Sequence, residues 1–207
     1  MFVTIFRCNT SPYYIVIAQG EQKNRIKDKL LAKFDSAIEA NKTLFGKVGL
    51  FFSGGAPDGD YNTQLEYTPD LNVHRRNCGF GLYDLLGIKK EDKKARNEQV
   101  RRNFEFFGAP VVFFVFVQGD MSVFSPLDVG FYLQTLLLSA HVNGLGTCAQ
   151  GALAMWKSPI LEEFPDVPKD YKLICGVSMG YPTDHVINTF NPGRRDVPGT
   201  TSIVGPK

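Results

Sequence analysis

Two periods of hydrophobic and polar positions alternate along this chain, and each period predicts a different kind of element. Short runs of β-branched and aromatic residues predict strands at residues 13–18 (YYIVIA), 111–117 (VVFFVFV) and 172–182 (KLICGVSMGYP). Residues 21–40 instead repeat their apolar positions at helical spacing. That pattern predicts a helix with one apolar stripe facing a core.

Three further helices are expected in the middle of the chain. One follows Pro69 and ends on Gly87, a residue suited to the left-handed conformation that closes helices. A second, highly charged helix is expected over residues 91–107, where the sequence GAP ends it. The third begins with Ser125 as its cap and ends near residue 143. Because this third helix is apolar nearly all round, we expect it to be buried on all sides or shared with another subunit.

Other segments show neither the strand pattern nor the helical pattern. Gln19 and Gly20 are expected to form a turn after the first strand, and residues 53–62 (SGGAPDGDYN) to form an exposed loop. Residues 181–207 are rich in proline, glycine and threonine. They cannot make a core of their own, so we expect an extended carboxyl-terminal arm that lies over a partner.

Composition narrows the class of protein. A chain of 207 residues with 43% hydrophobic content can build one core, so residues 1–207 are expected to form a single domain. A net charge of +2 supplies no broad field for nucleic acid or for a membrane surface, and neither is an expected partner. The four cysteines and three histidines are scattered, which indicates neither a metal site nor a disulfide framework. Without a secretory signal or an apolar run of the roughly 20 residues that span a bilayer, we expect a soluble cytoplasmic protein.

Residues 141–151 (HVNGLGTCAQG) concentrate small residues directly behind an apolar helix. Such a backbone can approach a phosphate, a flat aromatic ring or a neighbouring strand. The dinucleotide-binding fingerprint needs a strand before its glycines and a helix after them, whereas a helix precedes them here. No Gly-Lys-Ser/Thr sequence follows to make a phosphate-binding loop, and no serine hydrolase motif is present. A flat ring and close packing therefore remain, and Cys148 is expected to pack as a small buried residue.

Four motifs resemble one known family, in order and in spacing. They are RRNFEFFGAP at residues 101–110, LDVGFYLQ at 127–134, GLGTCAQ at 144–150 and CGVSMGYP at 175–182. The chain resembles the FMN-dependent nitroreductases over about residues 8–191. The resemblance implies an α+β fold with a mixed, largely antiparallel sheet flanked by helices. It also implies a homodimer with FMN at the subunit interface, where NAD(P)H and then a small electron acceptor bind in turn.

By this resemblance, Ala149, Gln150 and Gly151 lie along one face of the isoalloxazine ring, with the Gly151 amide directed at flavin N5. No catalytic side chain is required, because the flavin carries the hydride transfer while the protein orients it and tunes its electrons. The alternative interpretation is that these small residues only permit a helix and a strand to pack closely.

Contacts to the rest of the cofactor also follow from the resemblance. Asn9, in CNTSPYY, matches a family position near the flavin pyrimidine. Asn103 is expected to contact the ribityl chain or the phosphate. Arg194 and Arg195 occupy the place of a phosphate-binding arginine, and Arg195 is the preferred candidate. Ordinary surface placement is the alternative for Asn103, Arg194 and Arg195.

The amino end departs from the family pattern. Family members begin with a helix that carries Arg-Arg-Ser-x-Arg and holds the FMN phosphate, whereas this sequence begins with MFVTIFR. We therefore expect a chain that lacks the usual N-terminal helix, either as a truncated form or as a weak flavin binder. The function hypothesis is an NAD(P)H-dependent FMN oxidoreductase that acts on nitroaromatic or quinone-type acceptors. The alternatives are a dimeric scaffold without redox activity and an FMN enzyme with a different reduction.

Overall fold

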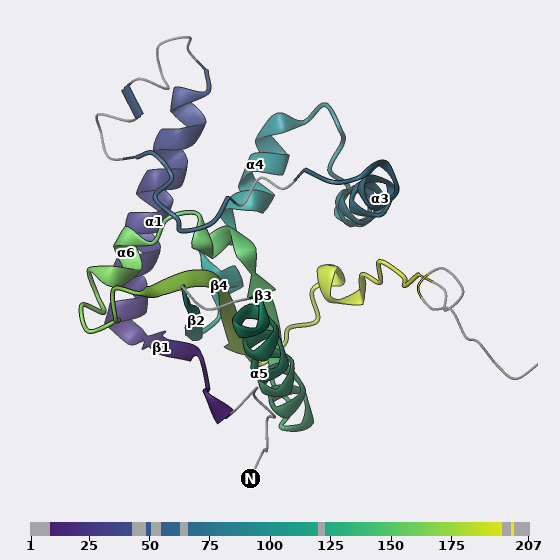
Figure 1. Ribbon diagram of the computed structural model, residues 1–207. Coiled ribbons are helices and arrows are strands. Elements are labelled where there is room, and N and C mark those ends of the chain that lie inside the picture. Colours follow the sequence, from purple (N-terminus) through teal and green to yellow (C-terminus); the bar gives the residue numbers. More distant parts are fainter. Residues whose placement is uncertain are drawn as a thin grey trace, which may run out of the picture. The chain divides into compact units, whose positions relative to one another are not determined.

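A four-stranded sheet forms the centre of the fold (Figure 1). Its order is β1 (Tyr13–Gln19), β2 (Val111–Gln118), β4 (Tyr171–Gly180) and β3 (Gly146–Gln150), and every neighbouring pair is antiparallel. The computed structural model describes residues 9–42, 49–50, 55–62, 66–119, 123–195 and 200. The three strands predicted from apolar runs are confirmed, as is the expected fold class of an antiparallel sheet flanked by helices.

The two faces of the sheet pack against different helices (Figure 1). Along β2, Val112, Phe114 and Phe116 point into the larger core, which includes helix α1 (Gly20–Ala40). The alternate residues of β2 point into a smaller core, which includes helix α5 (Phe124–Val142). This alternation follows from the two-residue period of a strand, and because both faces are covered, β2 is apolar at every position up to its last residue.

Helix α1 follows β1 without the expected turn. Gln19 is still in the strand, and Gly20 is the first helical residue. The change of direction is concentrated at Gly20, whose φ of +55° lies in the left-handed region that glycine enters easily. The predicted apolar stripe of α1 is confirmed, with Ile26 and Leu30 completely buried.

Helix α5 ends as predicted but begins earlier. Asn143 is its C-cap, and Gly144 follows with a φ of +75°. Ser125 was expected to cap the helix, and this prediction is wrong, because the helix already begins at Phe124. Ser125 therefore lies in the first turn, and its buried hydroxyl has no hydrogen-bond partner among the described residues.

The charged helix is shorter than its pattern predicts. Helix α4 spans Lys93–Arg101, and the short 3-10 helix η2 (Phe106–Gly108) follows after a turn. Phe106 and Phe107 have φ values of 55° and 51°, so both leave the right-handed helical region. The prediction of a helix up to residue 107 is wrong at this end, because Phe106 turns into the core, where it is completely buried.

Two short helices follow β3. Helix η3 (Gly151–Ala154) is 3-10, and α6 (Ser158–Leu161) is a single α-helical turn. Their side chains Leu153 and Ile160 complete the core beside α1.

Contacts divide the chain into two compact units. The first consists of the residues up to 65 together with 97–182, and it holds the whole sheet. The second consists of residues 66–96 and those from 183 on. It contains helix α3 (Pro69–Leu85), which is followed by a left-handed Gly87 as predicted, and the 3-10 helix η4 (Val186–Thr189).

Residues 181–195 and 200 of the expected carboxyl-terminal arm are described, and η4 is the regular element among them. A single domain over the whole chain stays a prediction. Within the described part of the chain, no helix has the length and the apolar character that crossing a membrane requires.

Candidate functional site

The small-residue segment forms the joint between α5, β3 and η3. Gly144 ends α5, and β3 then runs along β4, with Gly146 opposite Gly180 and Gln150 opposite Gly176. A Cβ on Gly146 would lie 3.3 Å from Cβ of Pro182, which is tighter than an ordinary contact. Helix closure and close packing, two of the sequence interpretations, therefore account for Gly144 and Gly146.

Gly151 is different, because neither explanation applies to it. It is exposed, its φ lies outside the left-handed region, and a Cβ built on it would meet no described atom within 4 Å. The protein itself therefore leaves room beside the backbone at the point where β3 gives way to η3. A flat ring that lies against this backbone would explain why a side chain is missing there.

The side chain of Gln150 points into the protein, and the residue is only 3% exposed. Its Nε2 donates a hydrogen bond to the backbone oxygen of Asn103 at 2.9 Å, and its Oε1 accepts one from the Ser178 hydroxyl. The structure thus brings together two residues that the sequence analysis singled out separately. Gln150 has only its backbone left for a ligand beside Gly151.

Asn103 is half-buried in the turn after α4. Its side-chain Nδ2 donates to the backbone oxygen of Val100 at 3.0 Å, so the amide closes its own turn. A contact between Asn103 and a cofactor stays a prediction.

The two residues before Gln150 are exposed in this chain. Ala149 and Cys148 both lie on the surface of β3, the strand at one edge of the sheet. The expectation that Cys148 is buried is therefore wrong, because only one neighbouring strand covers β3. Around the joint, the groups offered to a ligand are backbone amides and small neutral side chains. Such a surface can orient a planar molecule through hydrogen bonds.

Asn9, Arg194 and Arg195 are the other predicted site residues that the structure describes. Asn9 is exposed, with a left-handed φ of 54°. Arg194 and Arg195 are exposed in the second unit, where the Arg194 guanidinium donates to the backbone oxygen of Gly193 at 2.9 Å. Their contacts to a phosphate stay predictions, and Cys8, which opens the CNTSPYY motif, lies outside the described residues.

A support behind the joint escaped the sequence analysis. Residues 53–62 were expected to form an exposed loop, and residues 55–62 of it are described. The amides of Asp58 and Gly59 instead donate to the backbone oxygen of Met155, at 3.2 and 3.1 Å. The Asp58 carboxylate accepts from the backbone N–H of Lys157 at 2.7 Å, and Asp60 pairs with the Lys157 ammonium group. The aspartates and glycines of this segment predicted a loop. Aspartate side chains also commonly accept hydrogen bonds from backbone N–H groups, and this was the one signal in the sequence for the contacts seen here.

The chain is similar to known proteins over most of its length. The sequence profile of the Nitroreductase family matches residues 7–181. The chain is 34% identical over 203 residues to a 4-nitrobenzoate reductase of Pseudomonas putida, covering 95% of this chain and 79% of that protein. It is 32% identical over 174 residues to a 4-nitrobenzoate reductase of Nocardioides sp. (strain LMS-CY), covering 84% of this chain and 64% of the relative.

The fold is shared with solved structures. The FMN-dependent nitroreductase NfnB from Mycobacterium smegmatis, solved in complex with NADPH, superposes with a TM-score of 0.82. The match covers 98% of this chain and 83% of that one at 22% sequence identity, a likeness of fold. With the family profile matched over most of its length and a relative above 30% identity, this chain belongs to the Nitroreductase family.

Proposed function

We propose that this protein is an NAD(P)H-dependent FMN oxidoreductase that reduces nitroaromatic or quinone-type acceptors. Family membership supports the reaction class, and two relatives are named as 4-nitrobenzoate reductases. The observation that carries the proposal is the exposed backbone at Gly151, where a Cβ would point into open space. FMN, when bound there, would supply the hydride-transfer chemistry that links NAD(P)H oxidation to reduction of the acceptor.

The residues at the joint fit such a group. Ala149 and Gly151 present an exposed, uncharged stretch of backbone, and the buried side chain of Gln150 anchors that stretch. In the proposal, the backbone amide of Gly151 would hold the flavin ring near its N5 and would favour the negative charge of the reduced form. By the family resemblance, Arg195, with Arg194, would bind the FMN phosphate, and Asn9 and Asn103 would contact the rest of the cofactor.

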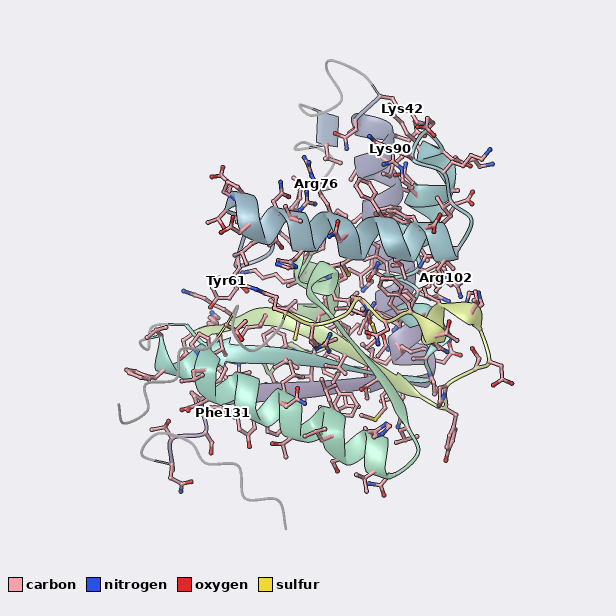
Figure 2. The ribbon with its side chains drawn as sticks, turned by 90° about the vertical axis from the view of Figure 1, so that its right-hand side faces the viewer. Lys42, Tyr61, Arg76, Lys90, Arg102 and Phe131 are labelled. Carbon is pink, nitrogen blue, oxygen red and sulfur yellow. The ribbon has the colours of Figure 1, made fainter. Side chains whose placement is uncertain are left out.

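The proposal includes a homodimer. Helix α5 carries apolar residues on its outer side, which we call the outer stripe: Phe124, Leu127, Phe131, Leu138 and Val142. They fall within an arc of roughly 60° at 3.6 residues per turn, opposite the side that packs on the sheet. Figure 2 labels Phe131, which is 51% exposed, on the side of α5 away from the sheet. An apolar stripe of this length supports docking of a second copy.

We also propose that the enzyme works in the cytoplasm, with a small molecule as its electron acceptor. The thiols of Cys78, Cys148 and Cys175 are free, as is usual in a reducing compartment.

The test begins with the purified wild-type protein. We expect a yellow flavin spectrum that bleaches when NADPH is added without oxygen and returns when 4-nitrobenzoate follows. A colourless protein that takes up no FMN would overturn the proposal and favour the non-redox scaffold.

A variant pair ties the result to Gly151. Gly151→Val should fold normally but lose FMN, because its side chain would fill the space beside the backbone. Ala32→Leu is the matched control, since it adds the same number of carbons at an exposed position of α1. Equal FMN content in both variants would contradict a flavin site at Gly151.

A further inference from the structure

The buried side chain of Gln150 is part of a small polar network that the proposed reaction does not itself require. Only four described polar or charged residues are buried, and Gln150 and Ser178, each 3% exposed, are two of them. Because a buried polar group without a partner is costly, their mutual hydrogen bond holds both side chains in one arrangement. Ser178 lies on β4, so this bond fastens the end of β3 to the interior of the sheet.

The other end of the Gln150 amide reaches a strained turn. The Asn103 oxygen that accepts from Gln150 Nε2 also accepts from the backbone N–H of Phe106 at 3.1 Å. Phe106 and Phe107 are both left-handed, which is unusual for bulky residues and persists only where surrounding structure imposes it. Arg102, labelled in Figure 2, lies in the same turn.

Packing holds this turn in place. Phe106 is completely buried, and its ring meets that of Phe114 on β2 edge to face, with centroids 6.2 Å apart. The Lys23 ammonium group of α1 donates to the backbone oxygen of Ala109 at 2.9 Å, just beyond the turn. Gln150 is therefore bonded to a rigid feature of the core.

The network lies at one particular point of the chain. Gln150 is the last residue of β3, and Gly151 is the first of η3. The hydrogen bonds that hold the Gln150 side chain also restrict the peptide bond between Gln150 and Gly151, because this peptide bond is directly attached to the Gln150 Cα.

We propose that Gln150 is a positioning residue. Its hydrogen bonds to Ser178 and to the Asn103 oxygen set the direction in which the backbone of residues 149–151 faces. This inference rests on the proposed function, in which that backbone faces the flavin. It assigns Gln150 a role through its side-chain anchors and not through contact with the cofactor.

The first experiment needs no cofactor. Gln150→Glu keeps the size of the side chain, but a carboxylate cannot donate to the Asn103 oxygen. In FMN-free protein we expect amide hydrogen exchange at residues 149–154 to become about tenfold faster, the change expected for one lost hydrogen bond. Gln19→Glu is the matched control, the same change at an exposed position. Exchange unchanged from wild type in Gln150→Glu would overturn the proposal.

The second experiment measures the flavin. With FMN bound, Gln150→Glu should lower kcat for NADPH oxidation by about 10- to 100-fold and leave KM for NADPH nearly unchanged, because the ring is misplaced while the nicotinamide site is intact. The reduction potential of the bound FMN should shift as well. Faster exchange combined with a wild-type potential and kcat would show a purely structural network and overturn the positioning role.

Ser178→Ala removes the hydrogen bond from the Ser178 hydroxyl to Gln150 Oε1. It should change amide exchange, kcat and the flavin potential in the same directions as Gln150→Glu, but by smaller amounts. This variant keeps the test decisive if Gln150→Glu fails to fold. A wild-type protein that takes up no FMN would overturn the proposed function, and the positioning of a flavin would fall with it. The exchange experiment would still report separately whether Gln150 holds residues 149–154.

Discussion

Gly59 shows how a single missing side chain lets two segments meet. A Cβ on this residue would lie 2.1 Å from the backbone oxygen of Ala154, a distance that no real contact reaches. The obstacle is backbone, so no side-chain rotation can relieve it. Glycine is required here by close approach, in contrast to Gly87, where the left-handed backbone requires it.

Gly59→Ala should therefore destabilise the protein. We expect the free energy of unfolding to fall by about 1–3 kcal/mol, the usual cost of overpacking, in a urea titration. Gly79→Ala on α3 is the control, because a Cβ there meets no described atom within 4 Å. If both variants unfolded at the same urea concentration as the wild type, residues 55–62 would not be held against η3 as described.

Cys175 and Cys78 should differ sharply in reactivity. Cys175 is 7% exposed, and burial raises the pKa of its thiol to about 11, whereas Cys78 is exposed on α3. Since the thiolate is the reactive form, iodoacetamide at mildly alkaline pH should alkylate Cys78 in the native protein and Cys175 only after unfolding. Peptide mass spectrometry would reveal this order, and rapid native labelling of Cys175 would contradict its burial.

At the scale of elements, α1 is joined to the segment just after α6 by an ion pair between Arg25 and Glu163 that includes three hydrogen bonds. The Arg25 guanidinium donates to both carboxylate oxygens of Glu163, and Lys29 adds a further contact at 3.2 Å. The hydrogen bond from Arg25 holds the pKa of Glu163 below its ordinary value of 4.5, in spite of desolvation, which acts in the opposite direction.

This pair should make stability depend on pH. Because the folded pKa of Glu163 is lowered, its contribution is present above pH 4.5 and is lost as the pH falls through the lowered value. We expect wild type to exceed Glu163→Gln in unfolding free energy near neutral pH, and this difference to shrink in acid. Glu91→Gln, at an exposed position, is the control. A difference that stayed constant from neutral to acidic pH would rule out this role of the Glu163 charge.

The sequence predicts the existence of elements better than their ends. Strong apolar runs and periods identified β1, β2, β4 and the longer helices, since these patterns reflect burial directly. The early end of α4 could not be predicted from apolar runs or from helical periodicity. It depends on Phe106 turning into a core built from distant strands, and tertiary packing of this kind overrides local propensity.

At the scale of the whole molecule, the candidate site was only partly predictable. The motifs pointed to residues 149–151, and the exposed backbone at Gly151 fits that expectation. The hydrogen bond from Gln150 to Asn103 joins residues 47 positions apart, and no periodicity contains such a contact. The strand order β1-β2-β4-β3 also depends on pairing between strands that are far apart in the sequence, so it could not be predicted from local patterns.

The outer stripe of α5 leads to a test of assembly. We expect the wild type to be a dimer in light scattering and Leu138→Glu to be monomeric, because a charge would have to be buried between subunits. Leu138 is 56% exposed in the single chain, so the variant should still fold. Ala32→Glu places the same charge on the exposed side of α1 and should remain dimeric. A monomeric wild type would exclude the proposed assembly.

The edge position of β3 has a practical consequence for handling the protein. β3 is an edge strand, and an edge strand has unpaired amide and carbonyl groups along its free side. These groups can pair with a strand of another chain and so promote aggregation. The exposed small residues of β3 carry no charge or proline that would discourage this. We therefore expect protein prepared without bound FMN, or as a monomer, to precipitate sooner on storage than the FMN-loaded dimer.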